Sequence, residues 1–108
     1  MVLMNNKSRI FGDLDAGVVT VDGVSLDPRK SQAVYNHSPE GFSWGYSGSG
    51  PSQLALALLL ETTTEEEAVK WYQEFKHDCI AVLPRKNFLM TADWIYTWLD
   101  NKRKNNEV

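Results

Sequence analysis

Short runs of apolar residues dominate the first half of the chain and predict strands. One run starts at residue 10, and two others, 18–21 and 24–26, flank the pair Asp22-Gly23. An Asp-Gly pair adopts the positive φ angles of a two-residue hairpin turn. We therefore predict an antiparallel hairpin, which Pro28 ends because proline cannot donate to a strand ladder.

The second half has helical patterns. Residues 51–61 carry Leu or Ala on every side, which indicates a helix buried all round. Overlapping capping boxes at 62–67 predict a second helix over 65–82. Its inner stripe consists of Ala68, Tyr72, Phe75, Cys79 and Val82. We expect an edge strand near 87–90 and a last helix over 92–102, capped by Thr91, with Ile95, Trp98 and Leu99 facing inward.

The middle of the chain is less regular. Residues 31–38 predict either a short strand or an irregular crossing, followed by a turn at 36–41. Phe42, Trp44 and Tyr46 then alternate with small residues, so a strand there shows three aromatic rings on one face. Behind a Gly/Ser run, Pro51 suits the first helical position, with Gly50 as the cap residue.

These elements fit one α+β domain spanning residues 1–108, with flexible tails at about 1–8 and 104–108. A small antiparallel sheet packs on the buried apolar helix, and two amphipathic helices complete the core. The hydrophobic fraction of 43%, with four Trp, four Tyr and four Phe, suffices for a core without disulfides.

Charge and cysteine content narrow the function classes. The net charge of −3 argues against sequence-independent nucleic-acid binding, which depends on Lys and Arg. The longest apolar run, 54–60, is far shorter than the ~20 residues of a membrane span. A single cysteine excludes an internal disulfide and fits a reducing compartment. We expect a cytoplasmic protein without membrane contact.

The Gly/Ser run before the apolar helix is the main candidate site. Free backbone N–H groups at a helix start bind anions, so this loop favours a small anionic ligand such as a nucleotide. In the alternative reading, the glycines serve only a sharp turn and close packing. The candidate ligand-binding residues are His37, Ser38, Trp44, Ser47, Gly48, Ser49, Gly50, Ser52 and Gln53.

Other chemistry has weaker support. His37 could act as a base with Ser38 or Ser49, but nucleophilic catalysis also needs an orienting group, and none is evident. We predict no catalytic residue and no cofactor. We also predict no metal site, because the two histidines lie far apart. Cys79 has the setting of an inert core thiol.

The segment Asn36-His37-Ser38-Pro39-Glu40-Gly41-Phe42-Ser43-Trp44-Gly45-Tyr46, followed by Gly48-Ser49-Gly50-Pro51 and Gln53-Leu54-Ala55-Leu56-Ala57, resembles a known family. Its members are small uncharacterised proteins of bacteria, archaea and phages, grouped as a domain of unknown function. The resemblance extends to the Phe75-Lys76 and Leu83-Pro84 pairs. Family members usually have Ala in place of Ser52 and often Gly in place of Ser47. The family has no assigned activity, so the resemblance implies no catalytic residue.

Three hypotheses follow. The first is a non-enzymatic module that binds a small anionic ligand between the His37 turn and the Gly/Ser loop. The second, suggested by the phage context, is an interaction or inhibitor module acting on a host protein through an acidic surface or through Trp71 or Trp94. The third is an enzyme that uses His37. The oligomeric state is open.

Overall fold

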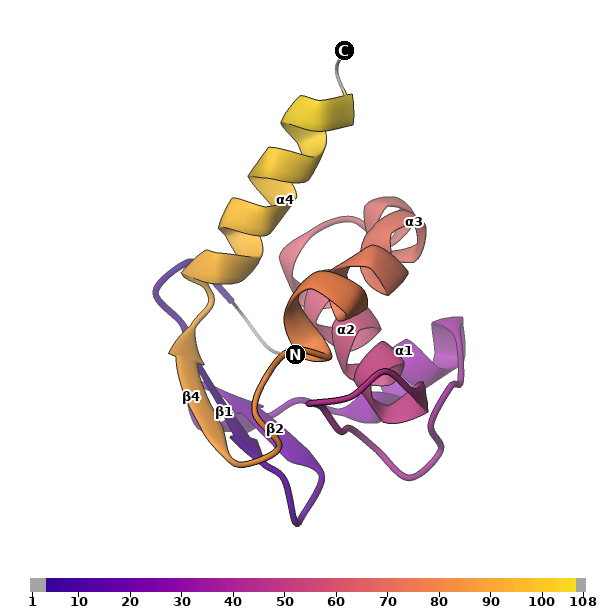
Figure 1. The fold of residues 1–108 in the computed structure, drawn as a ribbon, viewed down its shortest axis with the longest axis vertical. Helices are drawn as coiled ribbons and strands as arrows, with labels where there is room; N and C mark the ends of the chain where they lie inside the picture. Colours follow the sequence, from indigo (N-terminus) through magenta and orange to yellow (C-terminus); the bar gives the residue numbers. More distant parts are fainter. Residues whose placement is uncertain (1–3, 107–108) are drawn as a thin grey trace.

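The computed structural model describes residues 4–106 and contains a four-stranded antiparallel sheet with helices on one side (Figure 1). The strand order is β3-β2-β1-β4. The strands are β1 (Arg9–Asp13), β2 (Val18–Val21), β3 (Val24–Ser25) and β4 (Phe88–Thr91). The helices are α1 (Pro28–Val34), α2 (Ser49–Thr62), α3 (Glu65–Phe75), the π-helical turn η1 (Lys76–Ile80) and α4 (Asp93–Asn106). The α+β class is thus confirmed.

The chain ends were predicted to be flexible tails, and residues 1–3 and 107–108 lie outside the described residues. Within the described part, Ser8 is buried and α4 continues through Asn106.

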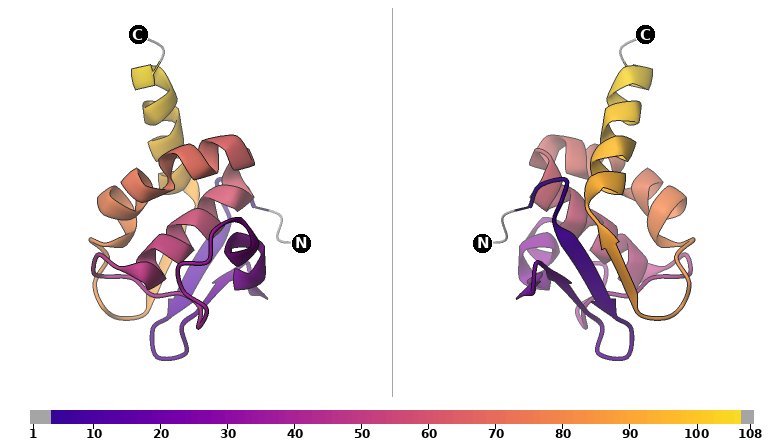
Figure 2. Two further views of the ribbon diagram at one scale, coloured as in Figure 1. Left: turned by 90° about the vertical axis from the view of Figure 1, so that its right-hand side faces the viewer. Right: turned by 90° about the vertical axis from the view of Figure 1, so that its left-hand side faces the viewer.

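The β2–β3 hairpin confirms the prediction from Asp22-Gly23. Val21 pairs with Val24, and the two turn residues have φ angles of 52° and 81°. Both angles are positive, as this tight turn requires. On the side of the sheet that faces the helices, Ile10, Val19 and Val21 are almost fully buried, whereas no helix of the described residues covers the opposite face (Figure 2).

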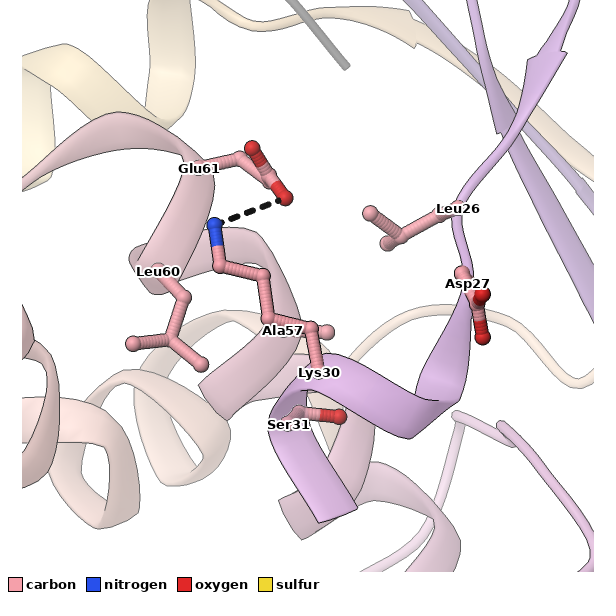
Figure 3. Close-up of a pocket in the computed structure, with 7 residues that line it drawn as sticks. All are labelled: Leu26, Asp27, Lys30, Ser31, Ala57, Leu60 and Glu61. Atoms are coloured by element: carbon pink, nitrogen blue, oxygen red, sulfur yellow. Dashed lines mark hydrogen bonds and ion pairs between the residues drawn. The ribbon is translucent and has the colours of Figure 1, made fainter. Parts of the chain in front are cut away.

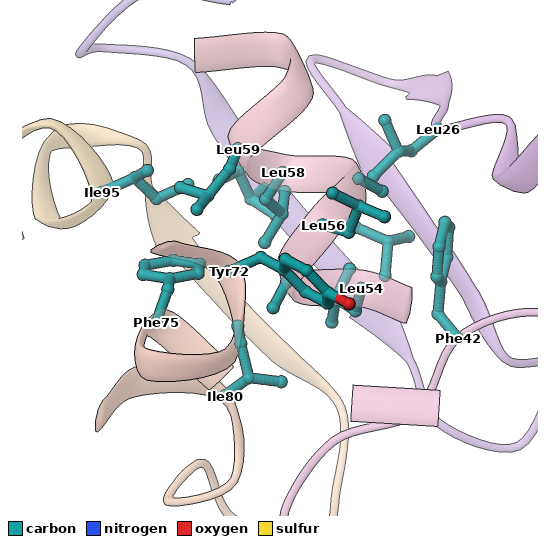
Figure 4. Close-up of a cluster of buried hydrophobic side chains, with 14 of the residues drawn as sticks. Leu26, Phe42, Leu54, Leu56, Leu58, Leu59, Tyr72, Phe75, Ile80 and Ile95 are labelled. Carbon is teal, nitrogen blue, oxygen red and sulfur yellow. The ribbon is translucent and has the colours of Figure 1, made fainter. Parts of the chain in front are cut away.

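Helix α2 is the centre of the core, as its all-apolar pattern predicts. Every residue from Gly50 to Leu59 is buried, and the leucines share one hydrophobic core with Ile10, Val19 and Val21 of the sheet and with the inner residues of α3 (Figure 4). Each buried leucine stabilises the fold by roughly 1.5–3 kcal/mol. The predicted start is wrong by two residues, because Gly48 and not Gly50 is the N-cap.

Helix α3 begins as predicted, with the Thr64 hydroxyl accepting a hydrogen bond from the Glu67 N–H at 3.2 Å. Its end is different, because Ala81 N–H binds the Lys76 carbonyl in an i→i+5 turn. This wider turn rotates the following residues away from an α-helical projection. Consequently Ile80 is buried, and the predicted inner residue Val82 is 70% exposed.

Residues 28–34 form α1, so both readings of the 31–38 segment, a short strand and an irregular crossing, are wrong for 31–34. The Asp27 carboxylate accepts a hydrogen bond from the Arg29 N–H at 2.9 Å, and Pro28 occupies the first helical position. An N-cap aspartate followed by proline is a helix start, and this pair therefore begins a helix as well as ending the strand.

The aromatic segment 42–46 is not a strand, so the prediction of a strand with three aromatic rings on one face is wrong. Phe42 and Trp44 are buried, while Tyr46 is 41% exposed. Trp44 donates its indole N–H to the Lys86 carbonyl at 2.8 Å and packs edge-on against Phe88. Gly12 provides the space for these rings, since a Cβ there would lie 2.3 Å from Phe88 and 2.8 Å from Trp44.

The C-terminal elements follow the prediction with one correction. Strand β4 lies at an edge of the sheet, as expected, and Ile95 and Leu99 of α4 are buried. Thr91 is the last residue of β4 and does not cap the helix, which begins at Asp93. Arg103 anchors α4 to α3 through Glu67 at 2.8 Å.

Candidate functional site

A polar cleft of about 370 Å³ opens where three segments of the chain meet. These segments are the β1–β2 turn, the loop between α1 and α2, and the first turn of α2. The residues that line the cleft are Leu14, Asp15, Ala16, Gly17, Ser38, Glu40, Gly41, Phe42, Ser43, Tyr46, Ser49 and Gly50.

One main-chain hydrogen bond joins the two loops beside the cleft, and another closes the α1–α2 loop on itself. The Phe42 N–H donates to the Gly17 carbonyl at 3.4 Å, and the Gly41 N–H donates to the Ser38 carbonyl at 3.4 Å. The β1–β2 turn is also held by Asn87, whose side-chain oxygen accepts a hydrogen bond from the Leu14 N–H at 2.8 Å. The cleft is therefore bounded by backbone that the rest of the fold holds in place.

The first turn of α2 provides the end wall of the cleft. Gly48 caps the helix without any side-chain hydrogen bond. Pro51 has no N–H, and the Ser52 N–H is occupied by the Gly48 carbonyl at 3.1 Å. Within the described residues, the N–H groups of Ser49 and Gly50 have no hydrogen-bond partner, as expected at a helix start.

Gly50 has a packing role in this wall. A Cβ added at Gly50 would lie 2.7 Å from the Ser43 Cβ, closer than atoms approach in folded proteins. The absence of a side chain thus lets α2 lie directly against the loop. This observation favours the structural reading of Gly50, without excluding contact between its N–H and a ligand.

The charges around the cleft are mixed. Two carboxylates, Asp15 and Glu40, belong to its lining. The guanidinium of Arg85 lies over the ring of Tyr46, with 4.7 Å between the Arg85 Cζ and the ring centroid. A cation beside Tyr46 and two carboxylates in the lining suit a ligand that carries both an anionic group and hydrogen-bond donors.

Gln53 is the most fully bonded of the predicted site residues, and its side chain is 0% exposed. Its Oε1 accepts hydrogen bonds from the N–H groups of His37 at 2.7 Å and Ser38 at 2.9 Å. Its Nε2 donates to the Ser31 hydroxyl at 2.9 Å and to the Tyr35 carbonyl at 3.0 Å. The side chain therefore ties the loop after α1 to the buried helix and does not reach the cleft.

His37 belongs to the same loop, and its ring contacts Tyr72 of α3 and Tyr35. Its Nε2 lies 2.7 Å from the Tyr72 hydroxyl, and its ring stacks on Tyr35 with centroids 5.3 Å apart. Within residues 4–106, neither Ser38 nor Ser49 hydrogen-bonds to the imidazole. His37 thus orders its own turn and contacts α3.

The remaining predicted residues separate into two groups. Ser38, Ser49 and Gly50 line the cleft, and Gly48 precedes them as the cap. Trp44 and Ser52 are buried away from it, with Ser52 donating to Gln73 at 3.4 Å, and Ser47 is exposed outside it.

The family assignment is decided by sequence comparison. A family described as a family of unknown function, DUF6166, matches residues 12–101 of the chain. The chain belongs to this family. No curated protein matches the sequence, and no solved structure matches the fold. The resemblance is thereby confirmed at the level of the family, while the motif as its signature and the taxonomic range stay predictions.

Several lining residues of this DUF6166 protein are absent from the sequence-based candidates. Asp15 and Ala16 come from a turn far away in sequence, and nothing local signals their approach to α2. Glu40, Ser43 and Tyr46 lie in segment 36–57, where the sequence predicts a turn followed by a strand. Ser43 alternates with the buried Phe42 and Trp44, and this was the available signal for its outward position. Glu40 and Tyr46 are in phase with the two buried rings, so the pattern gave no signal for them.

A second hollow of this chain lies between α1 and α2 (Figure 3). Leu26, Ala57 and Leu60 form its apolar part, and the ion pair of Lys30 with Glu61, at 3.3 Å, crosses it. It has no space for a water molecule. This crevice is a packing feature and offers no site.

Among residues 4–106 of the DUF6166 protein, no group of three His, Cys, Asp or Glu side chains is placed to hold a metal ion. Burial, together with the charge of Asp78, raises the pKa of the Cys79 thiol to about 11, which favours the protonated thiol at neutral pH. No described helix has the length and apolar character needed to cross a membrane.

Proposed function

We propose that this protein is a cytoplasmic, non-enzymatic binding module that holds a small anionic ligand, such as a nucleotide, in the polar cleft. The observation that carries the proposal is the cleft itself, with its volume of about 370 Å³. Small-molecule sites occupy roughly 300–1,000 Å³ and combine an apolar surface with a few convergent polar groups. Phe42 and Tyr46 supply the aromatic surface, and Ser38, Ser43 and Ser49 supply the polar groups.

The charges of the lining narrow the ligand chemistry. A phosphate fits at the N–H groups of Ser49 and Gly50, where the partial positive charge of α2 favours an anion. Asp15 and Glu40 disfavour a bare anion but accept hydrogen bonds from hydroxyl groups, as carboxylates do from ribose in other nucleotide sites. Tyr46 is 41% exposed, and a base that stacks on its ring takes the place of the Arg85 guanidinium or uses the ring face away from it. A mononucleotide meets all three requirements.

Ligand binding is tested by thermal denaturation and two-dimensional NMR of the protein with adenosine monophosphate, adenosine and inorganic phosphate. We expect a concentration-dependent rise in Tm with the nucleotide, and chemical-shift changes confined to residues 14–17 and 38–50. The absence of both effects at millimolar nucleotide would contradict the proposal.

A matched pair of substitutions isolates the N–H of Ser49. Proline is tolerated at the first helical position, so Ser49→Pro removes that N–H with little effect on α2. Ser49→Ala keeps the N–H and removes the hydroxyl. We expect Ser49→Pro to weaken nucleotide binding by roughly 10-fold or more, the value of a hydrogen bond to a charged group. Equal affinities of the two variants would exclude a phosphate at this helix start.

The other two hypotheses receive less support. His37 has no hydrogen bond to a serine hydroxyl in the described part of the chain, so no nucleophile is assembled around it. Trp71 is only 4% exposed, and Trp94 is half-buried and stacks on Phe75, which argues against a tryptophan-bearing partner surface. Action on a host protein and a phage origin stay predictions.

A further inference from the structure

The far edge of β4 is open. β4 is the last strand in the order β3-β2-β1-β4, and no other strand within residues 4–106 pairs with its outer side. Leu89, in the middle of this edge, is 65% exposed. An edge strand with free backbone groups is a template for pairing with another chain.

The register of the sheet determines which backbone groups face outward. Met90 is paired with Ile10, and the Ala92 N–H donates to the Ser8 carbonyl at 2.8 Å. In an antiparallel pair, alternate residues direct their N–H and C=O groups to the same neighbour. Met90 and Ala92 therefore bond toward β1, and Leu89 and Thr91 direct their peptide groups outward.

Nothing in β4 protects this edge. Its sequence, Phe88-Leu89-Met90-Thr91, contains no proline, no charge and no glycine, and its pairing with β1 has no bulge. The opposite edge of the sheet is different, because β3 has only two residues and Pro28 follows closely. Charges, prolines and short strands are the usual means of preventing edge pairing. β3 has such protection, whereas β4 lacks it.

We propose that two copies of this chain associate through β4, in antiparallel orientation, to form one continuous eight-stranded sheet. The two-fold axis passes beside Met90, so that Leu89 of each copy lies opposite Thr91 of the other. Since both residues direct their peptide groups outward, each of these two pairs exchanges two hydrogen bonds. Four main-chain hydrogen bonds then join the copies.

Charge complementarity favours a second copy in this orientation as the occupant. Lys86 precedes β4 and Asp93 follows it, and both side chains are exposed. Antiparallel pairing brings Lys86 of one copy to the end of the seam where Asp93 of the other copy lies, and symmetry repeats the pair at the other end. The two Leu89 side chains become diagonal neighbours on the open face of the sheet, within contact distance for long side chains.

The length of β4 determines how tightly we expect the two copies to bind. A seam of four residues is small compared with stable protein interfaces, so we expect a concentration-dependent dimer with a Kd of roughly 10 µM to 1 mM. Sedimentation velocity of the full chain, over about that range of concentration, should show a shift from monomer to dimer mass. A monomer throughout would overturn the proposal.

Substitutions at the seam locate the interface. Leu89→Lys places two like charges beside the axis, and we expect at least a 10-fold weaker dimer. Val24→Lys is the matched control, because Val24 is an exposed valine on the opposite edge strand, β3. Circular dichroism verifies that both variants fold. Equal dimerisation of Leu89→Lys and wild type would overturn the β4 interface.

A charge exchange tests the orientation. Lys86→Asp and Asp93→Lys should each weaken the dimer by placing like charges at both ends, and the double variant should restore it. Failure of the double variant to recover affinity would overturn the antiparallel register. Amide exchange provides a second measurement, since the N–H groups of Leu89 and Thr91 should become protected as the protein concentration rises.

Discussion

The Gln53 Oε1 lies 2.7 Å from the backbone nitrogen of His37, although the two residues belong to different elements. Gln53 is on the buried helix α2, and His37 is in the loop that follows α1. With its three other hydrogen bonds, the Gln53 amide satisfies the polar groups of a loop that would otherwise face an apolar helix. Such a buried amide stabilises the fold only while all its partners are present.

Replacement of Gln53 should be costly. In Gln53→Leu the side chain keeps a similar size, but the N–H groups of His37 and Ser38 lose their acceptor. We expect the free energy of unfolding to fall by about 2–4 kcal/mol, since each buried unpaired group costs about 1–3 kcal/mol. Urea denaturation measures the change. Asn101→Leu, at an exposed position on α4, is the control, and similar values for both variants would contradict the role assigned to Gln53.

A methyl group at Gly50 should also destabilise the protein. In Gly50→Ala the new Cβ meets the Ser43 Cβ at 2.7 Å, so α2 or the loop must move. Overpacking of this kind costs typically about 1–3 kcal/mol. The neighbouring exposed residue gives the comparison, because Ser49→Ala meets no such obstacle. If thermal denaturation shows Gly50→Ala to be as stable as Ser49→Ala, the close approach of α2 is not required for folding.

Acid should weaken the contact between α3 and α4. Hydrogen bonds from Arg103, and then from Thr63, lower the pKa of Glu67 below its ordinary value of 4.5. A lowered pKa in the folded state means that the stabilisation is present at neutral pH and is lost as the pH falls through the folded-state pKa. The difference in stability between wild type and Glu67→Gln, at most about 1 kcal/mol for a partly exposed pair, should therefore shrink from pH 7 to pH 3.

The comparison uses urea denaturation at several pH values, with Glu66→Gln as the control at an exposed neighbouring position. Asp27, whose pKa is lowered to about 2 by the Arg29 side chain and N–H, also loses its stabilisation between about pH 4 and pH 2, but it is present in both proteins and cancels from the difference. A constant difference between wild type and Glu67→Gln across the whole pH range would contradict the role of the ion pair.

Cys79 should react slowly with alkylating reagents. Its pKa of about 11 leaves little thiolate at neutral pH, so iodoacetamide should modify it roughly 100-fold more slowly than a free cysteine. Urea should abolish the difference by exposing the thiol. Fast modification of the folded protein at pH 7, followed by mass spectrometry, would show that the thiol is activated.

Features that depend on neighbouring residues were predictable from the sequence. Asp22-Gly23 specifies its hairpin through the φ angles of two residues, and the all-apolar pattern of α2 specifies its burial. The α1 helix also had a local signal, since Asp27-Pro28 is a cap followed by a first helical residue as well as a strand terminator. Gln53 had a signal of another kind, because a glutamine at the start of an apolar helix must find partners when buried.

Features that depend on tertiary contacts were not predictable in this way. The alternation of Phe42, Trp44 and Tyr46 resembles a strand, but no neighbouring strand pairs with it in the described fold, and the rings pack individually. The π-helical turn η1 rotates Val82 outward. No residue near η1 indicates in the sequence that the α-helical period ends there. The cleft likewise depends on Asp15 and Ala16, which reach it only because the β1–β2 turn contacts the loop at Phe42.

The hydrogen bonds of Trp44 and Gly45 have a consequence for the family segment. The Trp44 indole binds the carbonyl of Lys86, the Gly45 N–H binds that of Ile80 at 3.1 Å, and the His37 ring binds Tyr72. All three partners lie in the second half of the chain. The conformation of segment 36–57 thus depends on residues outside it, so an isolated peptide of residues 36–57 should not adopt this conformation. Substitutions near Tyr72 or Lys86 should alter the segment as strongly as changes within it.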